Sequence, residues 1–227
     1  MGNYTKASGY VSTAMGDETE ASGDFSTAMG YYTEASGDYS TAMGNDTEAS
    51  GYSSTAMGRS TSATGDFSTA MGDNTTASGD FSTAMGDNTT ASGNASTAMG
   101  FQTEAPSYTE TVIGRYNTLY TPTGVSQWNS SDRLFVIGNG LGTGLRRDAL
   151  VVLKNGNIGI GTSAPASDLH ITQSISDFPN PTTGGIILEE PDLSSKWQIW
   201  NSNPSLSFAF DNVRVARVDP TSGSWIV

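Results

Sequence analysis

A glycine recurs every seven residues through the first half of the chain, from Gly2 to Gly100 without a miss. The unit around it reads Gly-x-x-[Ser/Thr]-x-Ala-x, and two versions of this unit alternate. One version ends in Ser-Thr-Ala-Met, as at residues 12–15, and the other ends in Thr-x-Ala-Ser, as at residues 19–22. The true period of the sequence is therefore fourteen residues.

A seven-residue period is also that of a coiled coil, whose a and d positions need large apolar residues. One glycine in every heptad would cost such a helix about 1 kcal/mol each, so the pattern excludes a helix. Glycine instead permits a tight turn with positive φ after a strand of four or five residues. Two such strands in fourteen residues predict one coil of a parallel β-roll. The whole repeat predicts about seven and a half coils, stacked over roughly 35 Å at about 4.8 Å per coil.

The side chains available to fill such a roll are small. Alternation along the strand places Ser12 and Ala14 on one face and Thr13 and Met15 on the other. Each coil thus offers one Met, two Ala and small hydroxyls for burial. Ordering a coil costs on the order of 20 kcal/mol, whereas burial of one Met contributes about 2 to 3 kcal/mol. Because this core is thin, we expect the roll to associate with identical chains.

The alternation of Ser-Thr-Ala-Met-Gly with Thr-Glu-Ala-Ser-Gly over residues 2–106 resembles the head repeat of the YadA-like trimeric adhesins. This resemblance implies a left-handed parallel β-roll that forms a homotrimer. The chain departs from the family pattern in two ways. Thr and Met stand where a larger Val or Ile is usual, and no recognisable neck or heptad stalk follows.

Charge and composition narrow the range of partners. Residues 1–106 carry 13 acidic and 2 basic side chains, and residues 107–227 carry 10 acidic and 8 basic ones. Nucleic acids and anionic bilayers need a basic surface, so we expect neither nucleic-acid binding nor membrane insertion. The chain has no cysteine, which excludes disulfides and thiolate metal sites. It shows no membrane span and no signal-peptide pattern, which fits a fragment or a component of a particle.

The repeat ends near Pro106, and all eight prolines lie at or beyond that residue. We therefore predict an all-β chain of three regions: β-roll repeats over 1–106, a β-rich connecting module over 107–169 and a β-strand tip domain over 170–227, the C-terminal part also being trimeric. Strands are expected at 111–114, 134–137 and 149–153, and Asn155-Gly156 is expected to form a type I′ hairpin turn into residues 157–161. Further strands are expected at 185–188, 197–200, 206–210 and 213–218.

A second resemblance covers the region after the repeat. Residues 133–171, which include Lys154-Asn-Gly-Asn-Ile-Gly-Ile-Gly-Thr-Ser-Ala-Pro165, resemble the tail-fibre proteins of phages and of phage-like contractile injection systems. Residues 219–227 resemble the segment that precedes a self-cleaving intramolecular chaperone in such fibres. This implies a mature or truncated fibre whose chaperone, if encoded, was removed after trimerisation.

Two patterns raise the question of catalysis. Gly159-Ile160-Gly161-Thr-Ser-Ala164 formally matches a dinucleotide fingerprint, but Pro165 leaves no helix to receive a pyrophosphate, so we interpret it as a turn. His170 is the only histidine, and because no nucleophile motif accompanies it we interpret it as structural. A polysaccharide-cleaving tailspike would need a carboxylate pair between chains, and no pair stands out. We expect no enzyme and assign no catalytic, binding or metal-ligating residue.

Stacking of coils turns the variable positions into rows. Acidic rows could recruit Ca²⁺ or Mg²⁺, but a solvated acidic face is the favoured interpretation and we expect no cofactor. An aromatic row could contact sugars, although stacking between coils or burial between protomers is favoured. Repeated threonines, as at Thr75-Thr76, would suit ice binding, but Glu and Lys interrupt the lattice. The acidic rows are Asp24, Asp38, Asp66 and Asp80, and Glu20, Glu34 and Glu48; the aromatic row is Phe25, Tyr39, Phe67 and Phe81, with Tyr32 and Tyr52 in other rows.

The sequence therefore predicts a structural and receptor-binding trimeric tail fibre of a phage or phage-like contractile injection system. Its expected partners are identical chains, a glycan or protein of the target-cell surface, and the baseplate or other fibre components. The expected location is extracellular, on the particle. The alternative is the head domain of a cell-anchored trimeric autotransporter adhesin on a bacterial cell surface. A downstream chaperone domain would favour the fibre, and a coiled-coil stalk would favour the autotransporter.

Overall fold

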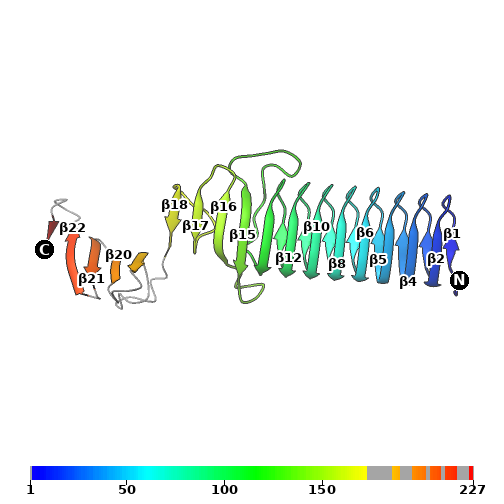
Figure 1. Cartoon of the computed structure of the whole chain (residues 1–227), viewed down its shortest axis with the longest axis horizontal. Coiled ribbons are helices and arrows are strands. Elements are labelled where there is room, and N and C mark those ends of the chain that lie inside the picture. The colour runs from blue at the N-terminus through cyan, green and yellow to red at the C-terminus, as the bar shows by residue number, and fades with distance from the viewer. Residues whose placement is uncertain are drawn as a thin grey trace. The chain divides into compact units, whose positions relative to one another are not determined.

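The computed structural model describes residues 2–172 and, as backbone strands only, residues 186–189, 196–202, 205–210, 213–218 and 225–226. Every regular element within these residues is a β-strand (Figure 1). None of these residues forms a helix that is long and apolar enough to cross a membrane. The chain divides into two compact units, residues 1–170 and 171–227.

The first unit is one sheet of eighteen strands wound into a roll. The strands of this unit are β1 (Lys6–Ala7), β2 (Thr13–Asp17), β3 (Glu20–Ala21), β4 (Thr27–Ala35), β5 (Thr41–Ala49), β6 (Thr55–Arg59), β7 (Ser62–Ala63), β8 (Thr69–Asp73), β9 (Thr76–Ala77), β10 (Thr83–Asp87), β11 (Thr90–Ala91), β12 (Thr97–Phe101), β13 (Glu104–Ala105), β14 (Thr111–Arg115), β15 (Arg133–Asn139), β16 (Asp148–Leu153), β17 (Ile158–Ile160) and β18 (Leu169–Ile171).

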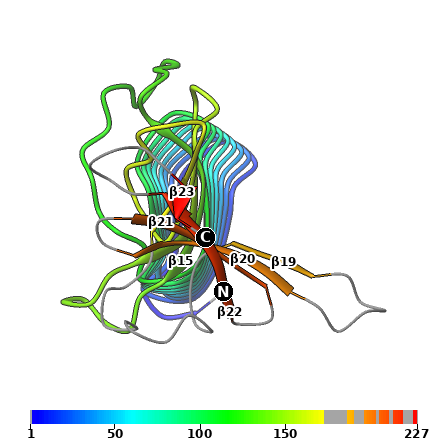
Figure 2. The ribbon, with the colours of Figure 1, turned by 90° about the vertical axis from the view of Figure 1, so that its left-hand side faces the viewer.

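Each strand of the repeat pairs in parallel with the strand one coil before and one coil after it. β8, for example, pairs with β6 and β10, so that Thr69 lies between Thr55 and Thr83. The short strands β7, β9 and β11 stack in the same way along the other side of the roll. Viewed end-on, the coils lie almost on top of one another (Figure 2). The predicted parallel β-roll with fourteen-residue coils is confirmed.

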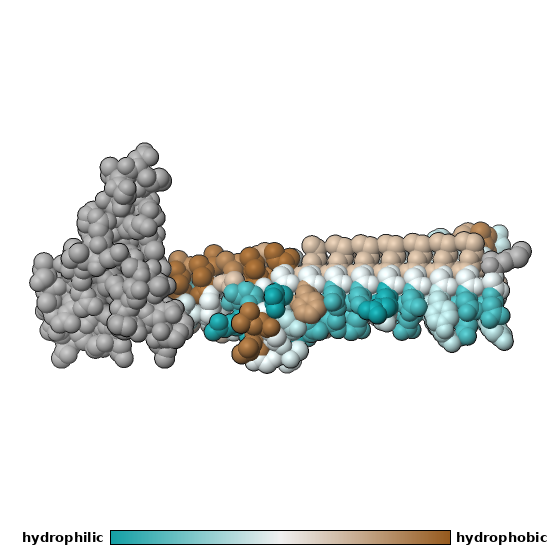
Figure 3. All heavy atoms as spheres, turned by 90° about the horizontal axis from the view of Figure 1, so that it is seen from below, coloured by the Kyte–Doolittle hydropathy of each residue, from teal (hydrophilic) through white to brown (hydrophobic). Residues whose placement is uncertain are grey.

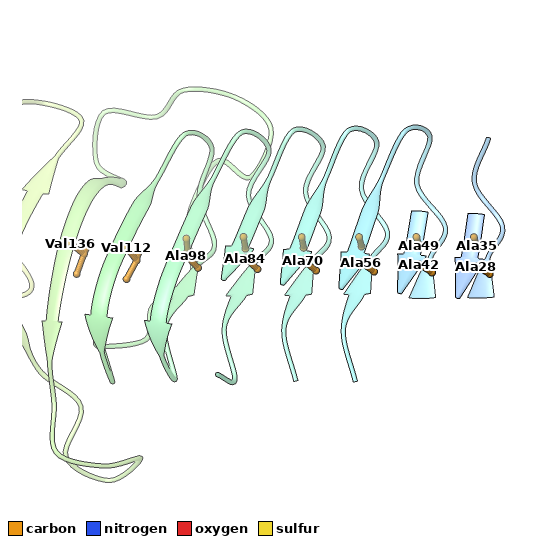
Figure 4. Packing of buried hydrophobic residues seen from close by; sticks show 14 of the residues in the cluster. Ala28, Ala35, Ala42, Ala49, Ala56, Ala70, Ala84, Ala98, Val112 and Val136 are labelled. Carbon is orange, nitrogen blue, oxygen red and sulfur yellow. The ribbon is translucent and has the colours of Figure 1, made fainter. Parts of the chain in front are cut away.

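Alanine fills the core of the roll. Two alanines from every coil are fully buried from Ala21 to Ala105, and their line is continued by Val112, Val136 and Val151 (Figure 4). The expectation that the methionines contribute to this core is wrong. Met29 and Thr27 point outward on either side of the buried Ala28, because successive residues of a strand face opposite ways.

Two rows of buried hydroxyls accompany the alanines. The serine before each long strand and the threonine before each short strand are buried, as at Ser68 and Thr75. From Thr19 to Thr103, the side-chain oxygens of both rows have no hydrogen-bond partner in the structure. Burying a hydroxyl without a partner costs about 1 to 3 kcal/mol. The interior of the roll is therefore narrow and contributes little stability for each coil.

The glycines of the repeat are required because the coils touch. A Cβ added to Gly65 would lie 2.1 Å from the carbonyl oxygen of Gly79 in the next coil. Gly72 meets the oxygen of Gly86 at 2.0 Å and in addition has a φ of +126°, which side chains rarely allow. Both glycines of a coil are therefore required by the close approach of the next coil. Gly72 is required in addition by its positive φ.

The stacking continues beyond the repeat. β14 pairs in parallel with β12, and β15 pairs in parallel with β14, so the roll extends across residue 106. β16 and β17 are then added as antiparallel strands. The predicted hairpin between them is present, but its turn is not type I′. Only Gly156 has a positive φ there, of +96°, whereas type I′ requires positive φ at Asn155 as well.

The second unit is an antiparallel sheet of five strands in chain order. Its register pairs Leu188 with Trp197, Ile199 with Phe208 and Val218 with Trp225. Four of its strands lie where the sequence predicts them, apart from Gly185, which lies outside the described residues. The strands are β19 (Ile186–Glu189), β20 (Lys196–Ser202), β21 (Ser205–Phe210), β22 (Val213–Val218) and β23 (Trp225–Ile226).

Candidate interaction surfaces

One outer face of the roll carries a continuous apolar row, here called the methionine stripe. In-register pairing aligns the methionine of every long strand and then continues the row with isoleucine and leucine beyond the repeat. The row consists of Met15, Met29, Met43, Met57, Met71, Met85, Met99, Ile113, Ile137, Leu150 and Ile160. Figure 3 shows an apolar band along the roll that becomes more hydrophobic toward its C-terminal end. Contiguous apolar surface of this kind marks interaction sites.

The face formed by the short strands is polar. Its outward row runs from Glu20 through Glu34 and Glu48 to Ser62, Thr76, Thr90 and Glu104. Glu20 forms an ion pair with Lys6, with 2.5 Å between Nζ and Oε1, and Glu104 lies 3.6 Å from the guanidinium of Arg146. The two faces of the roll therefore differ in chemistry, and only one of them is apolar.

The predicted aspartate row has a structural role at the corner that precedes each long strand. The Oδ1 atom of Asp38 accepts a hydrogen bond from the backbone N–H of Asp24 at 2.9 Å, and Asp66 accepts one from Tyr52 at 2.9 Å. Each carboxylate thus satisfies an N–H group of the coil before it. Among residues 2–172 and the C-terminal strands, no three His, Cys, Asp or Glu side chains come together as a metal site.

Six aromatic rings lie along the same corner, one per coil, and form the aromatic ridge. Phe25 stacks on Tyr39 and Phe67 stacks on Phe81, with 5.0 Å between centroids in both pairs. The predicted row contained these four rings, and the structure adds Tyr10 and Tyr52 through T-shaped contacts of 5.4 to 5.6 Å. Sequence register misses these two tyrosines because they stand one position earlier in the repeat. Tyr32 contacts Tyr31 instead, at the other corner.

Larger polar residues replace the small ones where the repeat ends, and they form a polar cap on the alanine core. Glu110 occupies the position of Ser96 in the preceding coil, since Thr97 donates to its carbonyl as Thr83 does to that of Ser96. Ser107 likewise occupies the position that Gly93 has in the preceding coil. Its hydroxyl donates to the carbonyl of Arg133 at 3.0 Å. A side chain fits at residue 107 because no repeat coil stacks directly on it.

Glu110 is fully buried in this cap. Its Oε2 accepts hydrogen bonds from the backbone N–H of Ser107 at 3.0 Å and from the hydroxyl of Tyr120 at 3.1 Å. Its Oε1 has no hydrogen-bond partner. Burial raises the pKa of Glu110 to about 7, because these bonds and the positive charge of Arg133 offset only part of the desolvation. Lys154 also lies in the cap, where Nζ donates to Ser107 Oγ at 3.0 Å and burial lowers its pKa.

The cap also fastens the loop of residues 116–132. Both carboxylate oxygens of Asp132 accept backbone N–H groups of that loop, from Thr123 and Gly124, at 2.8 Å each. The guanidinium of Arg133 lies 4.3 Å from the centre of the Tyr120 ring and donates to the carbonyl of Thr118 at 2.7 Å. These groups are used to hold the loop on the roll, so the cluster has the character of a structural cap.

The two patterns weighed for catalysis lie in ordinary strand and turn structure, in and after β17 and in β18. Gly159 lies within strand β17, and Gly161 follows it with a φ of +72°. No helix begins there, so the motif does not form a dinucleotide site. His170 lies in β18 and accepts a hydrogen bond from the backbone N–H of Ala166 at Nδ1, at 3.2 Å.

Comparison with known families identifies the repeat. The YadA head domain repeat, a model that spans two copies of that repeat, matches five segments: four that overlap, residues 7–33, 21–47, 35–61 and 49–75, and a separate one, residues 77–103. Such repeats are found in the surface-exposed heads of trimeric adhesins, where the β-roll is a structural fold rather than an enzyme fold. No curated protein matches this chain. The matched segments and the fourteen-residue parallel coils together show that the first half of the chain is a YadA-like β-roll.

Proposed function

We propose that the chain is one of three identical subunits of an extracellular fibre that attaches to a target-cell surface, and that this fibre belongs to a phage tail or to a phage-like contractile injection system. The adhesin repeat supports attachment to a surface. The resemblance of residues 133–171 to tail-fibre proteins supports the particle context. The segment 219–227, which carries a second tail-fibre resemblance, lies outside the described residues except for β23.

The observation that carries the proposal is the methionine stripe. It is continuous over eleven strands of the roll. Met15 in the first coil is 43% exposed, and the six methionines after it are half-buried. The core beneath it consists of alanine and unpaired hydroxyls, which stabilise a long roll poorly. Three copies that turn this stripe toward a common axis would bury it and supply the missing apolar contacts.

Light scattering tests the assembly. A mass near three times 23.6 kDa is expected for the unmodified chain. The double variant Met57→Asp, Met71→Asp should dissociate, because charge would enter the apolar contact. The control Ser62→Asp, Thr76→Asp places the same charges on adjacent coils of the polar face, and its trimeric mass should persist. A folded monomer for the unmodified chain, or a trimer that survives both aspartates, would contradict the proposal.

The same measurement in EDTA tests the acidic rows. We expect the mass to stay unchanged, because the corner aspartates already accept backbone N–H groups. Loss of the trimer in chelator would instead assign Ca²⁺ or Mg²⁺ to these rows.

The particle context is tested by the reading frame from which the chain comes. A self-cleaving chaperone domain after residue 227 would support the fibre. A coiled-coil stalk in its place would contradict the particle context and assign the chain to a cell-anchored autotransporter adhesin.

A further inference from the structure

The aromatic ridge exposes a large amount of ring surface. Its six rings, Tyr10, Phe25, Tyr39, Tyr52, Phe67 and Phe81, are each between 43% and 69% exposed. They cover six successive coils, a length of about 24 Å at 4.8 Å per coil. The two stacked pairs have their ring faces against each other. Tyr52 lies between the pairs, and its ring plane is inclined by 68° to that of Tyr39 and by 69° to that of Phe67. The faces of Tyr52 therefore turn away from both neighbouring rings.

The fold does not require rings at this corner. Phe67, Phe81 and Ala95 occupy the same position in successive coils, with φ values of 56°, 60° and 55°. The backbone of Ala95 bonds to the previous coil as that of Phe81 does, at 2.7 Å in both cases. A bulky residue in this left-handed conformation is strained, and an exposed ring gains little from burial. The backbone conformation is thus kept without a ring, which favours a role for the exposed rings outside the fold.

Hydrogen-bond acceptors line the ridge. Asp24, Asp38 and Asp66 are exposed beside the rings, and each uses only Oδ1 to accept a backbone N–H, so that Oδ2 remains available. Basic residues are scarce, since Lys6 and Arg59 are the only two before residue 107. Both form ion pairs, with Glu20 and Asp73 respectively. An anionic ligand would therefore be repelled, whereas an uncharged ligand rich in hydroxyl groups would find acceptors.

We propose that the aromatic ridge binds an uncharged carbohydrate chain that lies along the roll. Its apolar C–H faces would pack on the ring faces of Tyr10 and Tyr52, which are not stacked on a neighbour, and against the exposed edges of the stacked rings. Its hydroxyls would donate to the aspartate Oδ2 atoms. The length of the ridge suits an oligosaccharide of several units rather than a single sugar. This inference rests on the proposed receptor-binding function and names the class of receptor.

The test replaces the rings by residues that occupy the equivalent positions in other coils of the repeat. The triple variant Tyr52→Asp, Phe67→Ala, Phe81→Ala copies Asp66 and Ala95 onto the ridge. The control Tyr31→Asn, Tyr32→Asp copies Asn45 and Asp46 onto the opposite corner and removes two exposed tyrosines there. The unmodified chain is first screened on immobilised neutral and anionic oligosaccharides, and the strongest neutral ligand is then titrated against all three proteins.

Binding to a neutral oligosaccharide is expected, with a loss of at least tenfold in affinity for the triple variant and none for the control. Light scattering on the same samples should give one mass for all three proteins. Binding only to anionic glycans, no glycan binding, or equal affinity in the triple variant would overturn the proposal. A triple variant that dissociates would also overturn it, by placing the rings between protomers. A chain that is monomeric yet binds through the ridge would refute only the trimer.

Discussion

The repeat coils and the polar cap solve the same packing problem in opposite ways. In the repeat, Gly, Ser, Thr and Ala occupy the inward positions, and every coil lies directly on an identical one. In the cap, Ser107 and Glu110 stand at the corresponding positions. The difference shows that inward side chains are limited by the next coil, because larger ones appear only where direct stacking of repeat coils ends.

The largest effect is expected where a side chain would enter the stack. Gly72→Ala should destabilise the roll by about 3 to 5 kcal/mol, because the new Cβ meets a carbonyl oxygen and the φ of +126° is strained. Thermal unfolding followed by circular dichroism measures the loss. Gly142→Ala is the control, since its Cβ meets nothing within 4 Å. Equal stability of both variants would show that the coils are less tightly stacked than described.

The second effect is a pH dependence of the free energy of unfolding that comes from Glu110 in the cap. The folded-state pKa of Glu110 is raised from 4.5 to about 7, so its stabilising contribution is fully present below pH 4.5 and is lost as pH rises through 7. The difference corresponds to about 3 kcal/mol. Chemical denaturation at several pH values measures it. Because Tyr120, Arg133 and Lys154 also face this carboxylate, the matched variant is Glu110→Gln, which should flatten this part of the pH profile.

A profile that stays as steep in Glu110→Gln as in the unmodified chain would assign the pH dependence to other carboxylates. A profile that rises with pH would show that Glu110 is ionised in the fold and held by Arg133.

The smallest effect concerns the buried hydroxyls of the repeat. Ser68→Ala should stabilise the roll by about 1 kcal/mol, because Ser68 Oγ is buried without a hydrogen-bond partner. The control is Ser12→Ala in the first coil, where Oγ donates to the carbonyl of Gly9 at 2.8 Å. That variant should be slightly less stable than the unmodified chain. A loss of stability in Ser68→Ala would indicate that the hydroxyl rows bond across the core. Urea denaturation resolves differences of this size.

The strict period made most of the roll predictable. Glycine at every seventh residue required parallel coils of fourteen, and strand alternation separated Ser12 and Ala14 from Thr13 and Met15. The expectation that Met is buried in the roll went wrong because Met is the most hydrophobic residue of the repeat, and burial normally follows hydrophobicity. Here the stacking of repeat coils decides instead. Within the repeat the inward residues are alanine, serine and threonine, and larger ones such as Glu110 and Val112 are buried only beyond it.

The candidate surfaces were predictable only in part. The rows of Asp24 and Phe25 follow from stacking, but Tyr10 and Tyr52 join the ridge because a tyrosine side chain reaches over from the neighbouring position. The cap was not predictable, because its contacts join Ser107 to Lys154 across 47 residues of sequence. Such long-range pairing depends on where the loop of residues 116–132 returns to the roll, and no local pattern specifies that.

In-register stacking also makes the length of the roll a quantity that can be counted. Since each coil pairs with its neighbours through the same residues, removal of fourteen residues from the middle, such as 66–79, would leave new neighbours that match as the old ones did. The two ends and the cap would be unchanged, and the roll would shorten by one step of about 4.8 Å. A lineage carrying this gene can therefore adjust the reach of its protein in whole steps through ordinary duplication or deletion of a 42-base unit, without redesigning a single contact.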